Sequence, residues 1–469
     1  MPNTTERCDE PGPASADRTR APRLIDMGTP AATTPPAAAC APMHRVEAFF
    51  RSLGDDIAAT LGESREAIYA GLEQVALAKL EEHNPSAHIG HADLVDYVLG
   101  ADQLCKQADL DARFAEPPLS LYNGKHFDIS ALTWLDGTTS IHQHAFCGAF
   151  HVLQGSSIHS RYRFKPWQTP EPKQRAVAGA LELIDIEVLR AGDTRVIRRG
   201  DTLIHALFHM VRPSVTIVIR TITDDPEAEV QYDYRWPGLA HDPFHKHAPT
   251  IRKLQYLRML RVADADAFQA HLARVLPNCD LFLAYALVSE QIHVSADVDE
   301  ARRLAALCTQ LPAAERELLA KAAHNDLLSR TIIDLRRKLH EREHRFLLAL
   351  LLNVFDRGEL LRLVQREVAC ADPIAQVCLW IAEISGNTER YPNLIGIDFN
   401  ATALDLLACM FAGLDLADTQ RRMAERYGEA EVIEQREALG ALYRALQQCA
   451  LFHAQLGELN AGVDESARG

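Results

Sequence analysis

The sequence predicts an α+β protein in which an antiparallel β-barrel has helices before it and a separate all-helical domain after it. Between residues 117 and 235, short runs place apolar residues at every second position, as at Phe127, Ile129 and Ala131. Glycines interrupt these runs. A period of two is that of a β-strand, and the glycines mark turns. On both sides of this stretch, apolar residues recur every three or four positions, which is the period of a helix.

Five segments follow from these patterns. The N-terminal part is rich in Pro, Ala and Thr and has no apolar run, so we expect a disordered leader. The helices that follow should end before Pro117 and Pro118, because proline disfavours helix at the residue before it and cannot donate to the preceding turn. The expected segments are the leader at 1–42, a helical segment that packs on the barrel at 43–116, the barrel at 117–235, a turn-rich linker at 236–250 and the all-helical domain at 251–469.

Composition limits the partners of the protein. A net charge of −15 disfavours binding to nucleic acid or to an acidic membrane surface. No apolar run approaches the roughly 20 residues that a membrane span needs. The 10 cysteines include no CxxC pair, which is typical of reduced thiols. We therefore expect a cytoplasmic protein that binds neither nucleic acid nor membrane, and any homodimer would form through the helical domain.

Two histidines are the first candidates for chemistry. His142 and His144 are two residues apart in a predicted strand, so both imidazoles lie on one side of it. Neutral imidazole is a ligand for Fe, Zn, Cu or Ni. A third ligand would come from a later strand, because strands distant in sequence lie side by side in a small barrel. His209, which precedes the strand-like run at residues 215–220, and His205 are the two candidates.

The motifs around these histidines resemble the cupin double-stranded β-helix. Within the cupins, the lead-in Asn123-Gly124-Lys125 and the Gly148 position are similar to the cysteine dioxygenase branch, the thiol dioxygenases. The resemblance covers residues 117–235, about a quarter of the chain. The motifs are Trp134, Gly137, His142-x-His144, Gly148 and Val152-Leu153-x-Gly155, followed by the turn Gly200-Asp201 and by His209.

This resemblance implies an iron centre with three histidine ligands. An ordinary cupin has a metal-binding glutamate shortly after its His-x-His motif, and Gly148 stands at that position. The implied ligands are His142, His144 and His209, since the family pattern of a histidine, a short polar stretch and an apolar strand fits His209 better than His205. The implied cofactor is Fe(II), and the implied reactants are O2 and a small thiol, which would become a sulfinate.

The chain also departs from the thiol dioxygenase pattern. Thr216-x-Val218-x-Arg220 stands where these enzymes usually have Ser-x-His-x-Tyr, and the arginine that usually precedes the Asn-Gly-Lys stretch is missing. Another residue would have to hold an anionic substrate. We expect this to be Arg220, or else Arg161 or Arg163 on the strand after Gly155.

Other interpretations stay open. The barrel could belong to a different cupin enzyme, such as a carbon-carbon-cleaving dioxygenase or an isomerase, or to a non-catalytic protein that senses a ligand. Residues 340–344 form a formal HExxH motif, but they lie in a charged run typical of a solvated helix face, which argues against zinc. The histidines of the expected linker, His241, His245 and His247, are interpreted as incidental.

Overall fold

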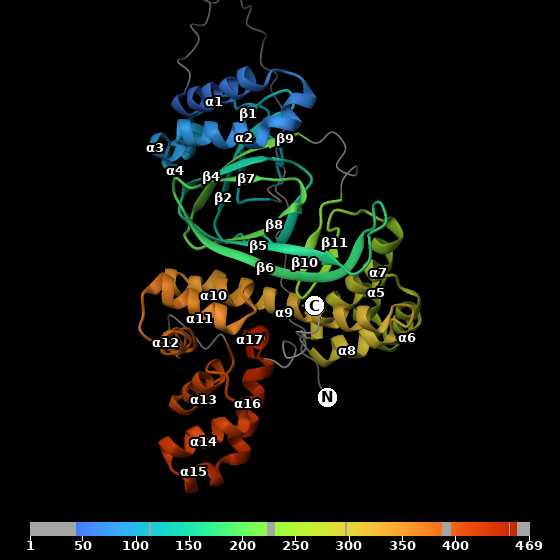
Figure 1. Cartoon of the computed structure of the whole chain (residues 1–469). Coiled ribbons are helices and arrows are strands. Elements are labelled where there is room, and N and C mark those ends of the chain that lie inside the picture. Colours follow the sequence, from blue (N-terminus) through green and yellow to red (C-terminus); the bar gives the residue numbers. More distant parts are fainter. Residues whose placement is uncertain are drawn as a thin grey trace, which may run out of the picture. The chain divides into compact units, whose positions relative to one another are not determined.

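The computed structural model describes residues 44–111, 114–222, 230–295, 298–386, 395–449 and 451–456. The expected leader lies outside these residues. Two antiparallel sheets form the centre of the fold, with helices before and after them in the sequence (Figure 1). The α+β class predicted from the sequence is therefore confirmed.

The N-terminal helices cover the outer face of the first sheet. Ser64 starts the second of these helices by accepting a hydrogen bond from the Ala67 amide, a common N-cap. Phe50 and Leu72 from the helices share one buried core with Ile129 and Ile217 from the sheet. The four helices are α1 (Arg45–Leu61), α2 (Arg65–His83), α3 (Pro85–His88) and α4 (His91–Gly100).

Nine strands form the main body of the barrel. The first sheet has the order β1-β2-β9-β4-β7, and the second contains β6-β5-β8-β3. From β2 to β9 the chain crosses repeatedly between the two sheets, and this strand order is that of a jelly roll, the architecture of cupins. The expected cupin double-stranded β-helix is thus present. The strands are β1 (Pro118–Asn123), β2 (Phe127–Trp134), β3 (Ile141–His144), β4 (Gly148–Gln154), β5 (Ser156–Pro166), β6 (Ala176–Arg190), β7 (Thr194–Ile197), β8 (Gly200–His209) and β9 (Ser214–Thr221).

A hairpin after the main strands closes the second sheet into a ring. Strand β10 (Asp233–Arg235) pairs with β3, and β11 (Leu239–His241) pairs with β6. The stretch expected as a linker therefore contains a strand. Its turn residues, Pro237 and Gly238, form the tip of this hairpin.

The C-terminal helices pack against the outer face of the second sheet. Phe208 and Ile158 from the sheet share a buried core with Leu335 and Leu347 from the helices. The helical stretch of residues 313–353 is broken around Leu339 into two helices. The helices are α5 (Ala248–Ala263), α6 (Ala265–Val275), η1 (Leu276–Asn278), α7 (Leu281–Ser295), α8 (Val298–Leu307), α9 (Ala313–Lys338), α10 (Arg342–Asn353), α11 (Arg357–Val368), α12 (Pro373–Ser385), α13 (Ala401–Phe411), α14 (Leu416–Tyr427), α15 (Glu429–Glu434), α16 (Arg436–Gln448) and α17 (His453–Leu456).

Two buried arginines join these helices to the barrel. Arg336 and Arg345 both donate hydrogen bonds to the carbonyl oxygen of His209, at distances of 2.7 and 3.1 Å. The Arg336 guanidinium also lies 4.3 Å from the centre of the Phe208 ring. The end of β8 is therefore held by side chains of α9 and α10.

Within the described part of the chain, no single helix has the length and apolar composition to cross a membrane. Helices α11 and α12 meet these criteria only together, as a pair bent by 86°.

Candidate metal centre

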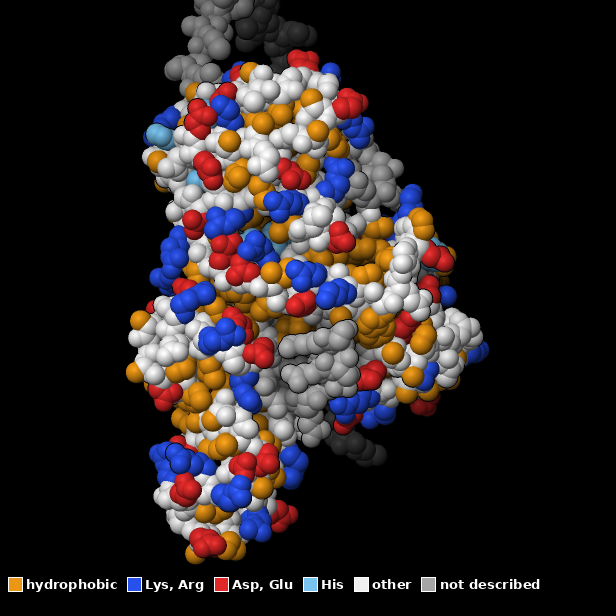
Figure 2. Space-filling view, in the orientation of Figure 1, with side chains coloured by type: hydrophobic (Ala, Val, Ile, Leu, Met, Phe, Trp, Pro, Cys, Tyr) orange, Lys and Arg blue, Asp and Glu red, His pale blue; other side chains and the backbone are white. Residues whose placement is uncertain are grey.

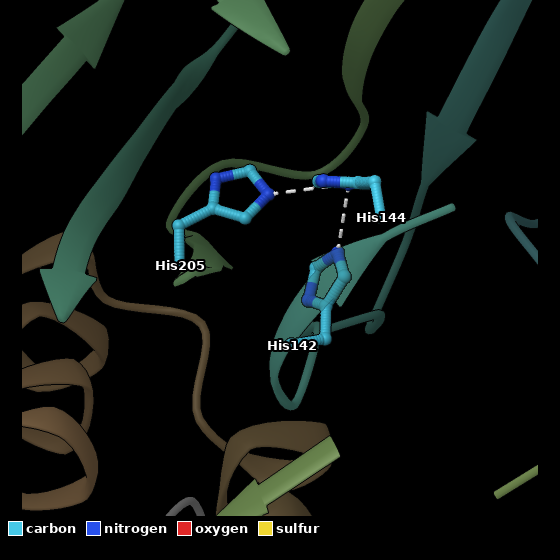
Figure 3. A group of neighbouring side chains, drawn as sticks. All are labelled: His142, His144 and His205. Carbon is cyan, nitrogen blue, oxygen red and sulfur yellow. Dashed lines mark hydrogen bonds between the residues drawn. The ribbon is translucent and has the colours of Figure 1, made fainter. Parts of the chain in front are cut away.

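Three histidines converge between strands β3 and β8. His142 stands opposite His205 in the pairing of these strands, and His144 follows two residues later on the same side. The Nε2 atom of His144 lies 3.1 Å from Nε2 of His142 and 3.4 Å from Nε2 of His205 (Figure 3). All three side chains are buried. Among the described residues, this is the group of potential ligands compact enough to hold a metal ion.

Hydrogen bonds on the far side of two rings fix where their protons lie. His142 Nδ1 is 2.8 Å from the carbonyl oxygen of Ser140, which can only accept, so Nδ1 carries the proton. His159 Nδ1 donates to the Glu187 carboxylate at 2.9 Å, so its Nε2 accepts from His205 Nδ1 at 2.8 Å. The Nε2 atoms of His142 and His205 therefore both present lone pairs to the centre.

Such an arrangement fits a shared cation. Two nitrogens that each lie about 2.1 Å from one ion, at angles of roughly 90° to 109°, are about 3.0 to 3.4 Å apart. The two Nε2 separations from His144 fall in this range. Because two of the three nitrogens are acceptors, hydrogen bonds alone cannot satisfy all of them. The donor set and its spacing suit a divalent transition metal.

Burial keeps these imidazoles in the form that binds metal. Desolvation lowers the pKa of His142, and it lowers the pKa values of His144 and His205 well below the ordinary value. Repulsion from His142 lowers the pKa values of His144 and His205 further. A metal ligand must be neutral imidazole, so protons compete little for this site near neutral pH.

His209, the expected third ligand, is not in this group. It lies four residues beyond His205 on β8, which at a rise of about 3.3 Å per residue is roughly 13 Å away. Its ring stacks on Trp134 at 4.7 Å, and its Nδ1 is 2.8 Å from Ser157 Oγ. The structure therefore places His205, the alternative candidate, beside His142 and His144, because the pairing register of β3 and β8 sets which histidine faces them.

No side chain can occupy the Gly148 position. Strand β9 crosses it so closely that a Cβ atom there would lie 1.9 Å from the carbonyl oxygen of Ile219. A carboxylate ligand at this position is excluded by that contact. The three histidines are consequently the donor set that the barrel offers at this site.

A cavity of about 640 Å³ opens beside His142 and His144. Arg220 borders it; its Nε lies 3.3 Å from Asp128, and its guanidinium lies 5.4 Å from the centre of the Phe146 ring. The wall also includes an ion pair between Arg175 and Asp242, which no sequence motif indicated. The remaining lining residues are Ala108, Asp109, Phe114, Pro118, Ser120, Ser130, Leu132, Ala145, Gln231, Phe244 and His245.

Arg161 and Arg163 do not border this cavity. Both are exposed on β5, where they pair with Asp185 and Glu182 of the neighbouring strand β6. The surface over these strands carries basic and acidic side chains next to one another (Figure 2). Of the three arginines proposed from the sequence, Arg220 is the one that borders the cavity.

The HExxH motif does not form a helix face. Helix α9 ends at Lys338 and α10 begins at Arg342, so His340 lies in the break between them. His340 is hydrogen-bonded to Arg212, and His344 to Glu383. The two imidazoles are therefore not one helical turn apart, as a zinc site of this kind requires.

Comparisons with known proteins give limited likenesses. No protein-family model matches the sequence, and no curated protein matches it. A hydroquinone 1,2-dioxygenase solved with Cd2+ and 4-hydroxybenzonitrile is 15% identical, with a TM-score of 0.18, over 23% of this chain and 63% of that one. An oxalate oxidase solved with glycolate is 18% identical, with a TM-score of 0.20, over 34% of this chain and 74% of that one.

A third solved structure is the DMSP lyase DddQ from Ruegeria pomeroyi DSS-3. It is 14% identical, with a TM-score of 0.21, over 39% of this chain and 95% of that one. Likenesses at these TM-scores decide neither the fold nor the activity of this chain. The cupin fold rests on the order of its strands.

Proposed function

We propose that this protein is a non-haem iron oxygenase that adds O2 to a small thiol or a related organic molecule. The observation that carries the proposal is the convergence of three Nε2 atoms, two with fixed lone pairs, beside a cavity that His142 and His144 border and that can hold an organic substrate. Fe(II) is the proposed ion because it uses imidazole ligands and reacts with O2 when positions stay open.

Each part of the site has a proposed role. His142, His144 and His205 would hold the ion, which when bound would supply open positions for the substrate and for O2. Arg220 would receive an anionic group of the substrate. Phe150, part of an apolar cluster between the sheets, lies 6.4 Å from the His205 ring and would keep water from that side.

The charge on the cavity wall favours this proposal over the other cupin chemistries. A carbon-carbon-cleaving dioxygenase for a neutral diketone, or an isomerase, could use the same three ligands. A guanidinium beside the metal ligands has no use for a neutral substrate, but it suits an anionic one. Arg220 is such a group, since it borders the same cavity as His142 and His144.

The test is metal content after anaerobic purification, together with O2 uptake. Wild-type protein should bind about one iron per chain, and His144→Ala and His205→Ala should each lose most of it. His209→Ala and His340→Ala are matched controls that should retain iron. The iron-loaded protein should consume O2 with cysteine, 3-mercaptopropionate, cysteamine or a larger thiol.

Two results would contradict the proposal. Loss of iron in His209→Ala with retention in His205→Ala would reverse the ligand assignment. Iron-loaded protein that consumes no O2 with any thiol, or with any other organic molecule that it binds tightly, would favour a ligand-sensing protein.

A further inference from the structure

The cavity beside the histidines is large for a compact thiol such as cysteine. Its volume of about 640 Å³ lies within the range of pockets that enclose drug-sized ligands, about 300 to 1,000 Å³. Cysteine has seven heavy atoms and would leave most of this space to water. A substrate that fills the cavity has a substantially larger body.

Aromatic side chains form much of the apolar wall. Phe114, Phe146 and Phe244 all border the cavity. Phe114 and Phe244 keep 48% and 62% of their surface exposed, so their rings are accessible to a ligand. Rings exposed around a cavity offer flat surfaces on which another ring can stack or pack edge to face.

Two arginines border the cavity, and each is paired with a carboxylate. Asp242 is buried and pairs with Arg175, so these two charges neutralise each other. Arg220 pairs with Asp128 through Nε at 3.3 Å, a longer contact than the 2.5 Å between Arg175 and Asp242, and among the described residues no hydrogen-bond partner meets its two terminal nitrogens. Asp109, the other carboxylate of the wall, accepts a hydrogen bond from the Phe114 amide. Phe146 contacts both the Arg220 guanidinium and the His144 ring, at 5.4 and 4.7 Å. An anion bound to Arg220 would therefore lie near the metal ligands.

From the size, the rings and this cation, we infer that the organic substrate is an aromatic acid, with a planar apolar body held by the phenylalanines and an anionic group received by Arg220. This inference rests on the proposed function, because it names the substrate of the same site. It distinguishes the site from one shaped for a small amino-acid thiol.

Binding of matched probes to the full-length protein tests the inference. The probes are 2-naphthoate, its neutral analogue 2-naphthamide, and cysteine, measured by calorimetry without O2. Naphthoate should bind at least about tenfold more tightly than cysteine, because its ring fills the cavity. Arg220→Gln should weaken naphthoate binding by about tenfold or more through loss of a charge-assisted hydrogen bond, and should leave naphthamide nearly unchanged.

Three further variants complete the design. Arg220→Lys should restore part of the naphthoate affinity, which shows that the effect comes from charge. Phe244→Ala should weaken naphthoate and naphthamide alike. Arg163→Gln, an exposed arginine outside the cavity, should change neither.

Separate outcomes distinguish this inference from the proposed function. Naphthoate binding that is no tighter than cysteine binding, or that is unaffected by Arg220→Gln, overturns the inference, even in protein that retains iron and consumes O2 with cysteine. Naphthoate binding with the expected Arg220 dependence supports it, even in protein that retains no iron, where the oxygenase proposal fails instead.

Discussion

Gly148 shows at the scale of one residue why this site has three ligands. The β9 backbone lies where a side chain at this position would begin, so the barrel gains close strand packing and loses a carboxylate ligand. Because Gly148 is recognisable in the sequence, a donor set without a carboxylate could be predicted without coordinates, although its third histidine could not. The reason for the missing carboxylate, contact with Ile219, could not be predicted either.

Gly148→Ala should destabilise the protein strongly. A Cβ atom 1.9 Å from a backbone oxygen forces the strands apart, and overpacking of this kind costs about 1 to 3 kcal/mol or more. Gly62→Ala is the control: its φ is also positive, at 74°, but nothing lies within 4 Å, so only the conformational cost of about 1 to 3 kcal/mol is expected, without the added cost of overpacking. Urea denaturation measures both, and equal losses would show that the close contact is unimportant.

The third ligand marks the limit of sequence reasoning at this scale. His142 and His144 follow from a period of two within one strand, which is a local property. The choice between His205 and His209 depends on which residue of β8 stands opposite His142, and strand register is set by the whole sheet. Both histidines lie on the same side of β8, so alternation could not separate them.

At the scale of elements, side chains from three strands form a chain of hydrogen bonds that ends at Nδ1 of His205. His159 on β5 bonds His205, Glu187 on β6 bonds His159, and Arg195 on β7 bonds Glu187 through two nitrogens, at 3.0 and 2.6 Å. Hydrogen bonds from His159 and Arg195 lower the pKa of Glu187, which keeps it an ionised acceptor. The chain of contacts fixes both the orientation and the proton position of the His205 ring.

Glu187→Gln should weaken metal binding while the fold survives. A neutral amide no longer requires a proton on His159 Nδ1, and loss of such support typically costs about 10 to 100-fold in metal affinity. Competition with a chelator measures the affinity, and circular dichroism checks the fold. Glu182→Gln, an exposed change on the same strand, should leave the affinity unchanged; an equal effect of both variants would contradict the role of Glu187.

Element boundaries were predictable only where local signals decide them. Strand β1 begins at Pro118, the second residue of the double proline. The hairpin around Pro237 and Gly238 carries the same turn residues as a linker, and only its pairing with β3 and β6 shows that it belongs to the barrel. The break between α9 and α10 near Leu339 contains no proline or glycine. The helical pattern of the sequence runs through it, so the break could not be predicted.

At the scale of the whole molecule, the barrel and the helices after it share a core. Ile158, Ile186, Phe208 and Met210 of the barrel region are buried in the same cluster as the residues of α9 and α10. The sequence predicted a helical domain after the barrel, but not that this domain covers the second sheet. The alternation of apolar residues in a strand shows that one face is buried, but not which part of the chain buries it.

A truncated chain of residues 44–247 should therefore fail to form a stable barrel. Each of the four uncovered side chains is worth about 1.5 to 3 kcal/mol when fully buried. Their sum is comparable with the whole stability of a typical domain, about 5 to 15 kcal/mol. The fragment should lack a cooperative thermal transition and bind no iron; a sharp transition with iron retained would show that the barrel is autonomous.

Because Arg336 and Arg345 donate hydrogen bonds to the His209 carbonyl oxygen, they connect helices α9 and α10 to the strand that carries His205. The clamped end of β8 lies four residues from His205 on the same strand, so a shift of α9 or α10 would be passed to one corner of the ligand triangle. Any molecule that favours one position of these helices would then tune metal affinity, and the metal would tune the affinity for that molecule by the same factor.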